Sequence, residues 1–198
     1  MAIKLASIFF TMILVDNYVL AKFLGICPFL GVSKKLDSAV GMSLAVTFVM
    51  VMATAATWPL YRGILAPNGL EYLQTIVFIL VIAILVQLLE NFLKKFIPAL
   101  YKSLGVYLPL ITTNCTILGV TILNLDNGYS FPESIVCAAG AGIGFLVAMV
   151  LFSGVRRKVE QAIVPECFKG LPITLVAAAM TSLSFMGFGG IVEAIFGV

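Results

Sequence analysis

The sequence contains no histidine, and only 11% of its 198 residues are charged. Without an imidazole, the chain has no histidine metal ligand, no histidine proton relay and no histidine base to activate a nucleophile. The net charge of +3 is too small to indicate binding to nucleic acid. A phosphate-binding loop, a catalytic triad and a c-type haem attachment motif are absent as well, so nothing indicates a soluble active site.

Apolar residues dominate what is present: they make up 62% of the chain, and the mean hydropathy is +1.15. A soluble domain of this length could not bury so many apolar side chains. Five uncharged runs of 18 to 24 residues are each close to the roughly 20 residues that a helix needs to cross a bilayer. These runs are 38–61, 72–89, 103–125, 134–155 and 170–192. The pattern predicts an all-α integral membrane protein.

The N-terminal stretch predicts a sixth span that is interrupted. Residues 5–15 and 23–33 are uncharged, but Asp16, Asn17 and Lys22 lie between them. A cleaved signal peptide has its charges first, then an unbroken apolar core, and this stretch does not follow that order. We therefore expect six transmembrane helices, the first of them broken.

Basic residues are concentrated in alternate connections. The connections after the first, third and fifth spans carry nine of them: Lys34, Lys35, Lys94, Lys95, Lys102, Arg156, Arg157, Lys158 and Lys169. The opposite side carries only Lys4 and Arg62. The positive-inside rule therefore places the basic loops in the cytoplasm and both termini outside. Six spans divide into repeats at 1–97 and 98–198, and three spans per repeat make the second repeat inverted relative to the first.

A phrase at 27–33 recurs at 115–121, with cysteine, leucine, glycine, valine and a hydroxyl residue at the same offsets. Pro28 in the first copy is expected to push Cys27 out of helical geometry, and Pro109 is expected to interrupt the helix before the second copy. Broken helices at matching places in inverted halves indicate a site inside the membrane.

The two repeated cysteines, Cys27 and Cys115, are candidate metal ligands, because thiolates are soft donors that favour iron-sulfur clusters, zinc and copper(I). Two thiolates make only half of a four-ligand site, so the other half would come from another chain. Free cysteines that behave as small apolar residues, or a disulfide between the two, are the alternatives. Cys137 and Cys167 have no counterpart in the repeat and are interpreted as structural.

Three polar residues within or at the ends of spans are candidates for an ion path: Asp16, Asn17 and Glu90. For Glu90 the alternative is a simple ion pair with Lys94 at the cytoplasmic edge of its helix. Lys22 is interpreted as a side chain that extends its ammonium group toward the membrane surface.

Three stretches resemble the RnfA/NqrE family, which comprises membrane subunits of the Rnf complex and of the sodium-pumping NADH:quinone reductase. These stretches are 23–35, 108–115 and 184–188, and the likeness extends over nearly the whole chain. Pro28 and the pair Thr112-Thr113 favour the Rnf branch over the quinone reductase branch.

The resemblance implies a subunit of a bacterial inner-membrane complex that couples electron transfer between ferredoxin and NAD to the pumping of Na⁺ or H⁺. It implies a homologous partner of opposite orientation, RnfE-like, together with flavin-bearing and iron-sulfur subunits. It also implies that Cys27 and Cys115 supply two of the four ligands of an intramembrane 2Fe-2S cluster, so this chain alone holds no complete active site. The rival hypotheses are an inverted-repeat secondary transporter without redox chemistry and a purely structural assembly subunit.

Overall fold

The computed structural model describes residues 2–33, 36–96, 108–162 and 164–187, and within these ranges the chain is helical with no strand. A π-helical turn (Tyr61–Leu65) extends α3, and short 3-10 turns (Glu71–Leu73, Glu166–Phe168) precede α4 and α9. The helices are α1 (Ala2–Leu14), α2 (Ile26–Val32), α3 (Leu36–Leu60), α4 (Gln74–Phe96), α6 (Leu108–Thr112), α7 (Cys115–Asp126), α8 (Phe131–Glu160) and α9 (Leu171–Met186).

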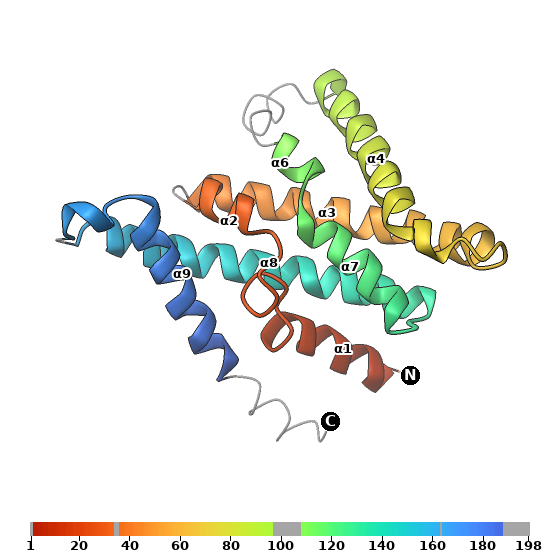
Figure 1. Ribbon diagram of the computed structural model, residues 1–198, viewed down its shortest axis with the longest axis horizontal. Coiled ribbons are helices and arrows are strands. Elements are labelled where there is room, and N and C mark those ends of the chain that lie inside the picture. The colour runs from red at the N-terminus through yellow and green to blue at the C-terminus, as the bar shows by residue number, and fades with distance from the viewer. Residues whose placement is uncertain (1, 34–35, 97–107, 163, 188–198) are drawn as a thin grey trace.

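Helices α3 and α8 form the centre of the molecule, side by side along its long axis (Figure 1). Helix α1 packs on α8, and α7 packs on α3. Glycines on α8 permit this close packing: a methyl group on Gly142 would lie 2.4 Å from the Thr47 side chain of α3, and one on Gly144 would lie 3.0 Å from the Met12 carbonyl oxygen of α1. Small residues allow helix backbones to approach in this way within membranes.

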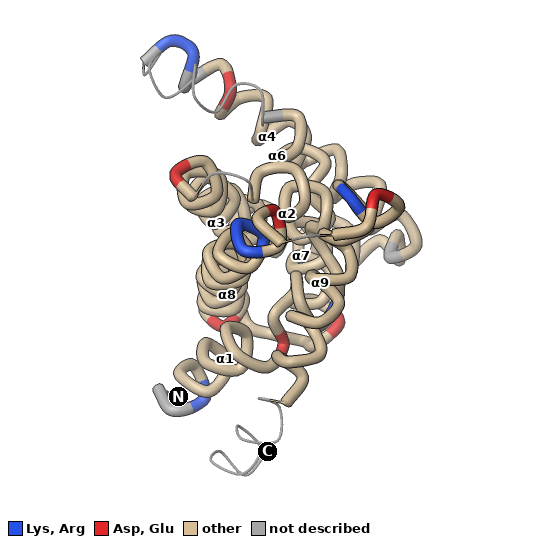
Figure 2. The backbone as a smooth tube through the Cα atoms, turned by 90° about the vertical axis from the view of Figure 1, so that its left-hand side faces the viewer, with Lys and Arg blue, Asp and Glu red and all other residues tan. Residues whose placement is uncertain are grey.

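Three helical segments in the described part of the chain are long and apolar enough to cross a membrane: Leu36–Leu65, Gln74–Asn91 and Phe131–Glu160. They confirm three of the predicted runs. Figure 2 shows how few charged residues lie along the helices. Of the remaining runs, 103–125 and 170–192 fall partly outside the described residues, and the six-span inverted repeat with boundaries at 1–97 and 98–198 stays a prediction.

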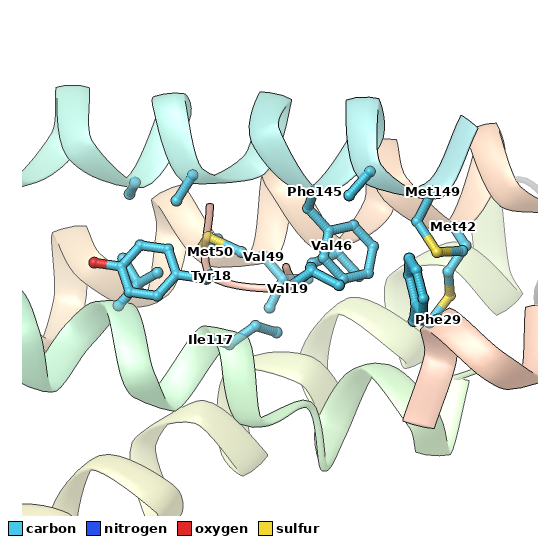
Figure 3. Packing of buried hydrophobic residues seen from close by; sticks show 14 of the residues in the cluster. Tyr18, Val19, Phe29, Met42, Val46, Val49, Met50, Ile117, Phe145 and Met149 are labelled. Atoms are coloured by element: carbon cyan, nitrogen blue, oxygen red, sulfur yellow. The ribbon is translucent and has the colours of Figure 1, made fainter. Parts of the chain in front are cut away.

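The hydrophobic core includes the segment between α1 and α2 as well as the long helices. Tyr18 and Val19 from this segment are 2% and 3% exposed and point in among α3, α7 and α8, where Ile117 and Phe145 also lie (Figure 3). Irregular backbone at membrane depth is stable only where protein covers it. The interruption of the first helix is therefore packed inside the molecule.

Candidate functional site

The first helix break runs from residue 15 to residue 25, between α1 and α2. Asn17, 1% exposed, satisfies much of its backbone. The Asn17 amide donates to the Gly144 carbonyl at 2.8 Å, and its Oδ1 accepts from the backbone N–H groups of Val19 and Leu20 at 3.1 and 3.4 Å. Gly144 lies about 20 Å along α8 at about 1.5 Å per residue, so the break packs against the middle of this helix.

Gly25 ends the break in a left-handed conformation, with φ of 80°, and α2 begins at the next residue. Cys27 thus lies in the first turn of α2. The expectation that Pro28 would force Cys27 out of helical geometry was wrong. Proline is tolerated in a first helical turn, because the N–H groups there have no intrahelical acceptor.

The other end of α2 is held by helix α8. Phe29 stacks on Phe152, with ring centroids 4.1 Å apart. One turn further along α8, Arg156 donates from Nη1 to the Leu30 carbonyl and, at 2.8 Å, to Ser33 Oγ. The Arg156 side chain is only 11% exposed. These contacts fix the position of the half-helix that carries Cys27.

The second break is much shorter and lies at residues 113 and 114, between α6 and α7. Thr113 donates to the Pro109 carbonyl through both its N–H and its hydroxyl group, at 3.2 and 2.9 Å. Asn114 caps α7, since its Oδ1 accepts from the Thr116 N–H at 3.0 Å. Pro109 lies within α6, so the interruption seen in the described residues follows Thr112 rather than coinciding with the proline.

The two breaks are in contact. A methyl group on Gly25 would lie 2.2 Å from Thr116 Oγ1 and 3.0 Å from Asn114 Oδ1, and one on Gly119 would lie 2.5 Å from the Leu24 side chain. The two candidate ligands follow directly on these contacts. Cys27 lies in the first turn of α2, and Cys115 is the first residue of α7.

The four cysteines fall into distinct environments, and all four are free thiols. Cys27 and Cys115 are exposed at the ends of their half-helices. Cys137 is fully buried in the core, as expected of a structural residue. Cys167 is exposed in the 3-10 turn Glu166–Phe168. The thiols of Cys27 and Cys115 are therefore accessible to a partner chain.

A cavity of about 400 Å³ opens beside Cys115. Its walls come from α4, through Ile79, Ile82 and Ala83, and from the second break with the start of α7. Most of the lining is apolar, and Asn114 and Cys115 are among the polar groups that reach it. Such a mainly apolar recess with few polar groups is typical of a site that binds a cofactor or another chain.

No group of three metal-ligating side chains forms within the part of the chain that the structure describes. The donor set does fit half of an iron-sulfur site. It offers two accessible thiols on adjoining half-helices, and beside Cys115 it offers the buried amide nitrogen of Asn114, which has no hydrogen-bond partner. A second chain with two thiolates would complete four ligands.

The three predicted ion-path residues lie in two places. Asp16 and Asn17 belong to the first break, where Asp16 forms an ion pair with Lys22 at 3.8 Å and Lys22 lies over the Tyr18 ring at 5.1 Å. Glu90 lies on α4 and accepts from Gln87 at 3.4 Å. The Asn17 amide is fully engaged in holding the break together, while an ion path through these residues stays a prediction.

Sequence reasoning missed two residues at this site. Asn114 carried a signal, since asparagine immediately before an apolar run is a typical helix cap. Arg156 carried none, because it stands in a basic run that is equally typical of a membrane edge. Only the packing of α8 against α2 shows that its side chain turns inward.

Comparison with known proteins gives a consistent result. The family described as "Rnf-Nqr subunit, membrane protein" matches residues 5–192. The chain is 55% identical over 180 residues to the A-type subunit of an ion-translocating oxidoreductase complex from Syntrophotalea carbinolica, covering 91% of this chain and 93% of the relative. It is 53% identical over 186 residues to the A-type subunit of the Na⁺-translocating ferredoxin:NAD⁺ oxidoreductase complex from Acetobacterium woodii, covering 94% and 97%.

Proposed function

The chain belongs to the Rnf-Nqr family of membrane subunits, and on this basis we propose that it is a subunit of an ion-translocating ferredoxin:NAD oxidoreductase complex. In this proposal Cys27 and Cys115 hold half of a 2Fe-2S cluster within the inner membrane. A homologous, RnfE-like subunit of opposite orientation supplies the other two thiolates, and flavin-bearing and iron-sulfur subunits complete the complex. Both termini lie outside, and the basic loops lie in the cytoplasm.

The observation that carries this proposal is the contact between the two broken helices. Gly25 lies against Asn114 and Thr116, so the half-helices that begin with Cys27 and Cys115 start from one place. Both thiols are exposed rather than buried in the single-chain core. Two accessible thiols on a rigid, buried scaffold are what a metal group shared between two chains requires.

When bound, the cluster supplies a one-electron carrier inside the membrane. The residues of this chain provide its surroundings. The apolar walls formed by Ile79, Ile82 and Ala83 keep the dielectric constant low around Cys115. Additional negative charge in such surroundings is costly unless a cation accompanies it. This cost is the physical basis on which the subunit would couple electron transfer to the movement of Na⁺ or H⁺.

The test is to replace Cys27 and Cys115 singly with serine in the purified complex and to record its electron paramagnetic resonance spectrum. We expect each variant to lose the signal of one 2Fe-2S cluster and at least tenfold of the ferredoxin:NAD activity. Cys167→Ser, at an exposed cysteine outside the breaks, is the matched control and should keep both.

An unchanged signal in both variants would end the ligand assignment. If the variants also kept electron transfer, a structural role in assembly would remain, and ion transport without redox chemistry would point to the secondary transporter. Loss of the signal in the Cys167→Ser control as well would show general instability of the complex rather than loss of ligands.

A further inference from the structure

Asn114, one residue before the proposed ligand Cys115, uses only half of its side chain within the described part of the protein. Its Oδ1 accepts from the Thr116 N–H at 3.0 Å and so caps α7. Its Nδ2 is buried and has no hydrogen-bond partner there. The residue as a whole is 4% exposed. A buried donor without an acceptor is costly, so such a group calls for an explanation.

Exchange of the amide oxygen and nitrogen does not remove this unpaired group. The oxygen faces the Thr116 N–H, which is itself a donor, so an exchanged amide would lose the cap and set two donors against each other. The helix cap therefore fixes the orientation of the amide and leaves Nδ2 as the free donor.

The position of Asn114 indicates what the donor serves. Among the described polar side chains that are buried without a partner, Asn114 alone lines the cavity of about 400 Å³, which Cys115 lines as well. On its other side, Asn114 lies against Gly25, two residues before Cys27. The free donor thus lies between the two cysteine-bearing half-helices, where the proposed function requires an acceptor rich in negative charge.

We propose that Asn114 Nδ2 donates a hydrogen bond to a sulfur atom of the group held by Cys27 and Cys115 and thereby raises its reduction potential. The proposal rests on the proposed function. Hydrogen bonds to the sulfur atoms of iron-sulfur clusters help to set their potentials, because the donor stabilises the extra negative charge of the reduced form more than the oxidised form. The equivalent position in the first break is Ile26, which has no side-chain donor, so the influence comes from one half of the repeat alone.

The experiment separates the donor from the cap. Asn114→Ser and Asn114→Asp both keep a side-chain oxygen that can cap α7 and both remove the amide donor. Asn127→Ser, at the exposed opposite end of the same helix, is the matched control. For each variant in the purified complex, the cluster is titrated with reductant under electron paramagnetic resonance, and the melting temperature is recorded.

We expect both Asn114 variants to shift the midpoint to lower potential. At the parent midpoint, the ratio of reduced to oxidised cluster should fall about tenfold, which is about 59 mV for a one-electron couple. The melting temperature of Asn114→Ser should stay close to that of the parent, because the cap is kept, and Asn127→Ser should shift neither quantity.

Two negative results are distinguishable. If the parent shows the cluster and loses it on Cys115→Ser, but Asn114→Ser and Asn114→Asp titrate at the parent midpoint, the inference about Asn114 is overturned and the ligand assignment stands. If the parent complex shows no cluster that depends on Cys27 and Cys115, the proposed function fails and the inference fails with it.

Discussion

The two helix breaks of this molecule place a cysteine in the first turn of a half-helix by different means. The first break extends over residues 15–25 and depends on contacts with distant helices, through Asn17 to α8 and through Gly25 to α7. The second occupies residues 113 and 114 and is held locally by the Asn114 cap. A similar phrase in the sequence thus gives one break held by tertiary packing and one held by its own side chains.

The half-helices that follow also differ. Helix α2 ends at Val32, and Arg156 binds its C-terminal end, whereas α7 continues through twelve residues to Asp126. A helix as short as α2 has little stability of its own, because nucleation consumes most of its hydrogen-bonding gain. We therefore expect the first break to be the more sensitive of the two, and the predictions below test this difference.

The largest effect is expected at Gly25, where Gly25→Ala adds a methyl group 2.2 Å from Thr116 Oγ1 on a residue with φ of 80°. Left-handed backbone costs a non-glycine residue about 1–2 kcal/mol, and overpacking adds about 1–3 kcal/mol. The melting temperature of the purified complex should fall, with a loss of about 3 kcal/mol in unfolding free energy, and the cluster signal should weaken.

Gly128→Ala is the matched control for this prediction. Gly128 also has a positive φ, 65°, but open space surrounds the added methyl group. It therefore carries the backbone strain of about 1–2 kcal/mol without the collision. Equal losses of stability in the two variants would show that the contact between the two breaks does not constrain them.

The sequence predicted the breaks themselves better than their construction. The repeated phrase correctly marked interruptions ahead of Cys27 and near Cys115. It misplaced their causes, because proline was taken to disrupt the helix at Cys27, whereas Pro28 and Pro109 both lie inside helices. Proline is compatible with the start of a helix, and where a helix starts depends here on the glycine or asparagine that precedes it.

Contacts across long sequence separation could not be predicted at all. Uncharged runs located α3, α4 and α8, because the length of an apolar helix is a local property. The packing of Arg156 on Leu30 joins residues 126 positions apart, and no periodicity encodes it. The same holds for the approach of Gly25 to Thr116, on which the candidate site depends.

A smaller effect is expected at Arg156. Arg156→Ala leaves the Leu30 carbonyl and Ser33 without their donor at the end of α2, and an unpaired buried polar group costs about 1–3 kcal/mol. We expect a loss of about 2 kcal/mol, measured by thermal unfolding of the purified complex, with a weaker cluster signal. Arg156→Lys, which keeps the charge but not the forked geometry, should recover part of it.

Arg157→Ala controls for the removal of a positive charge from the same turn, since Arg157 is exposed. It should leave both the melting temperature and the cluster signal near those of the parent. A loss as large in Arg157→Ala as in Arg156→Ala would attribute the effect to the charge of the loop rather than to the support of α2.

The smallest effects are expected at Gly31 and Gly119, which occupy equivalent positions of the repeated phrase. Nothing lies within 4 Å of a methyl group on Gly31, so Gly31→Ala should stabilise the protein by about 0.5–1 kcal/mol through the unfolded chain. A methyl group on Gly119 meets Leu24 Cδ1 at 2.5 Å, the movable end of a side chain.

For Gly119→Ala the same gain of about 0.5–1 kcal/mol is therefore opposed by the cost of moving Leu24, about 1–3 kcal/mol for overpacking. We expect a small net loss of about 1 kcal/mol, measured by thermal unfolding of the purified complex beside Gly31→Ala. Opposite signs at equivalent glycines would show that the two halves differ in how they are packed although they share a phrase. Equal gains would mean that Leu24 moves freely and that contact between the breaks is limited to Gly25.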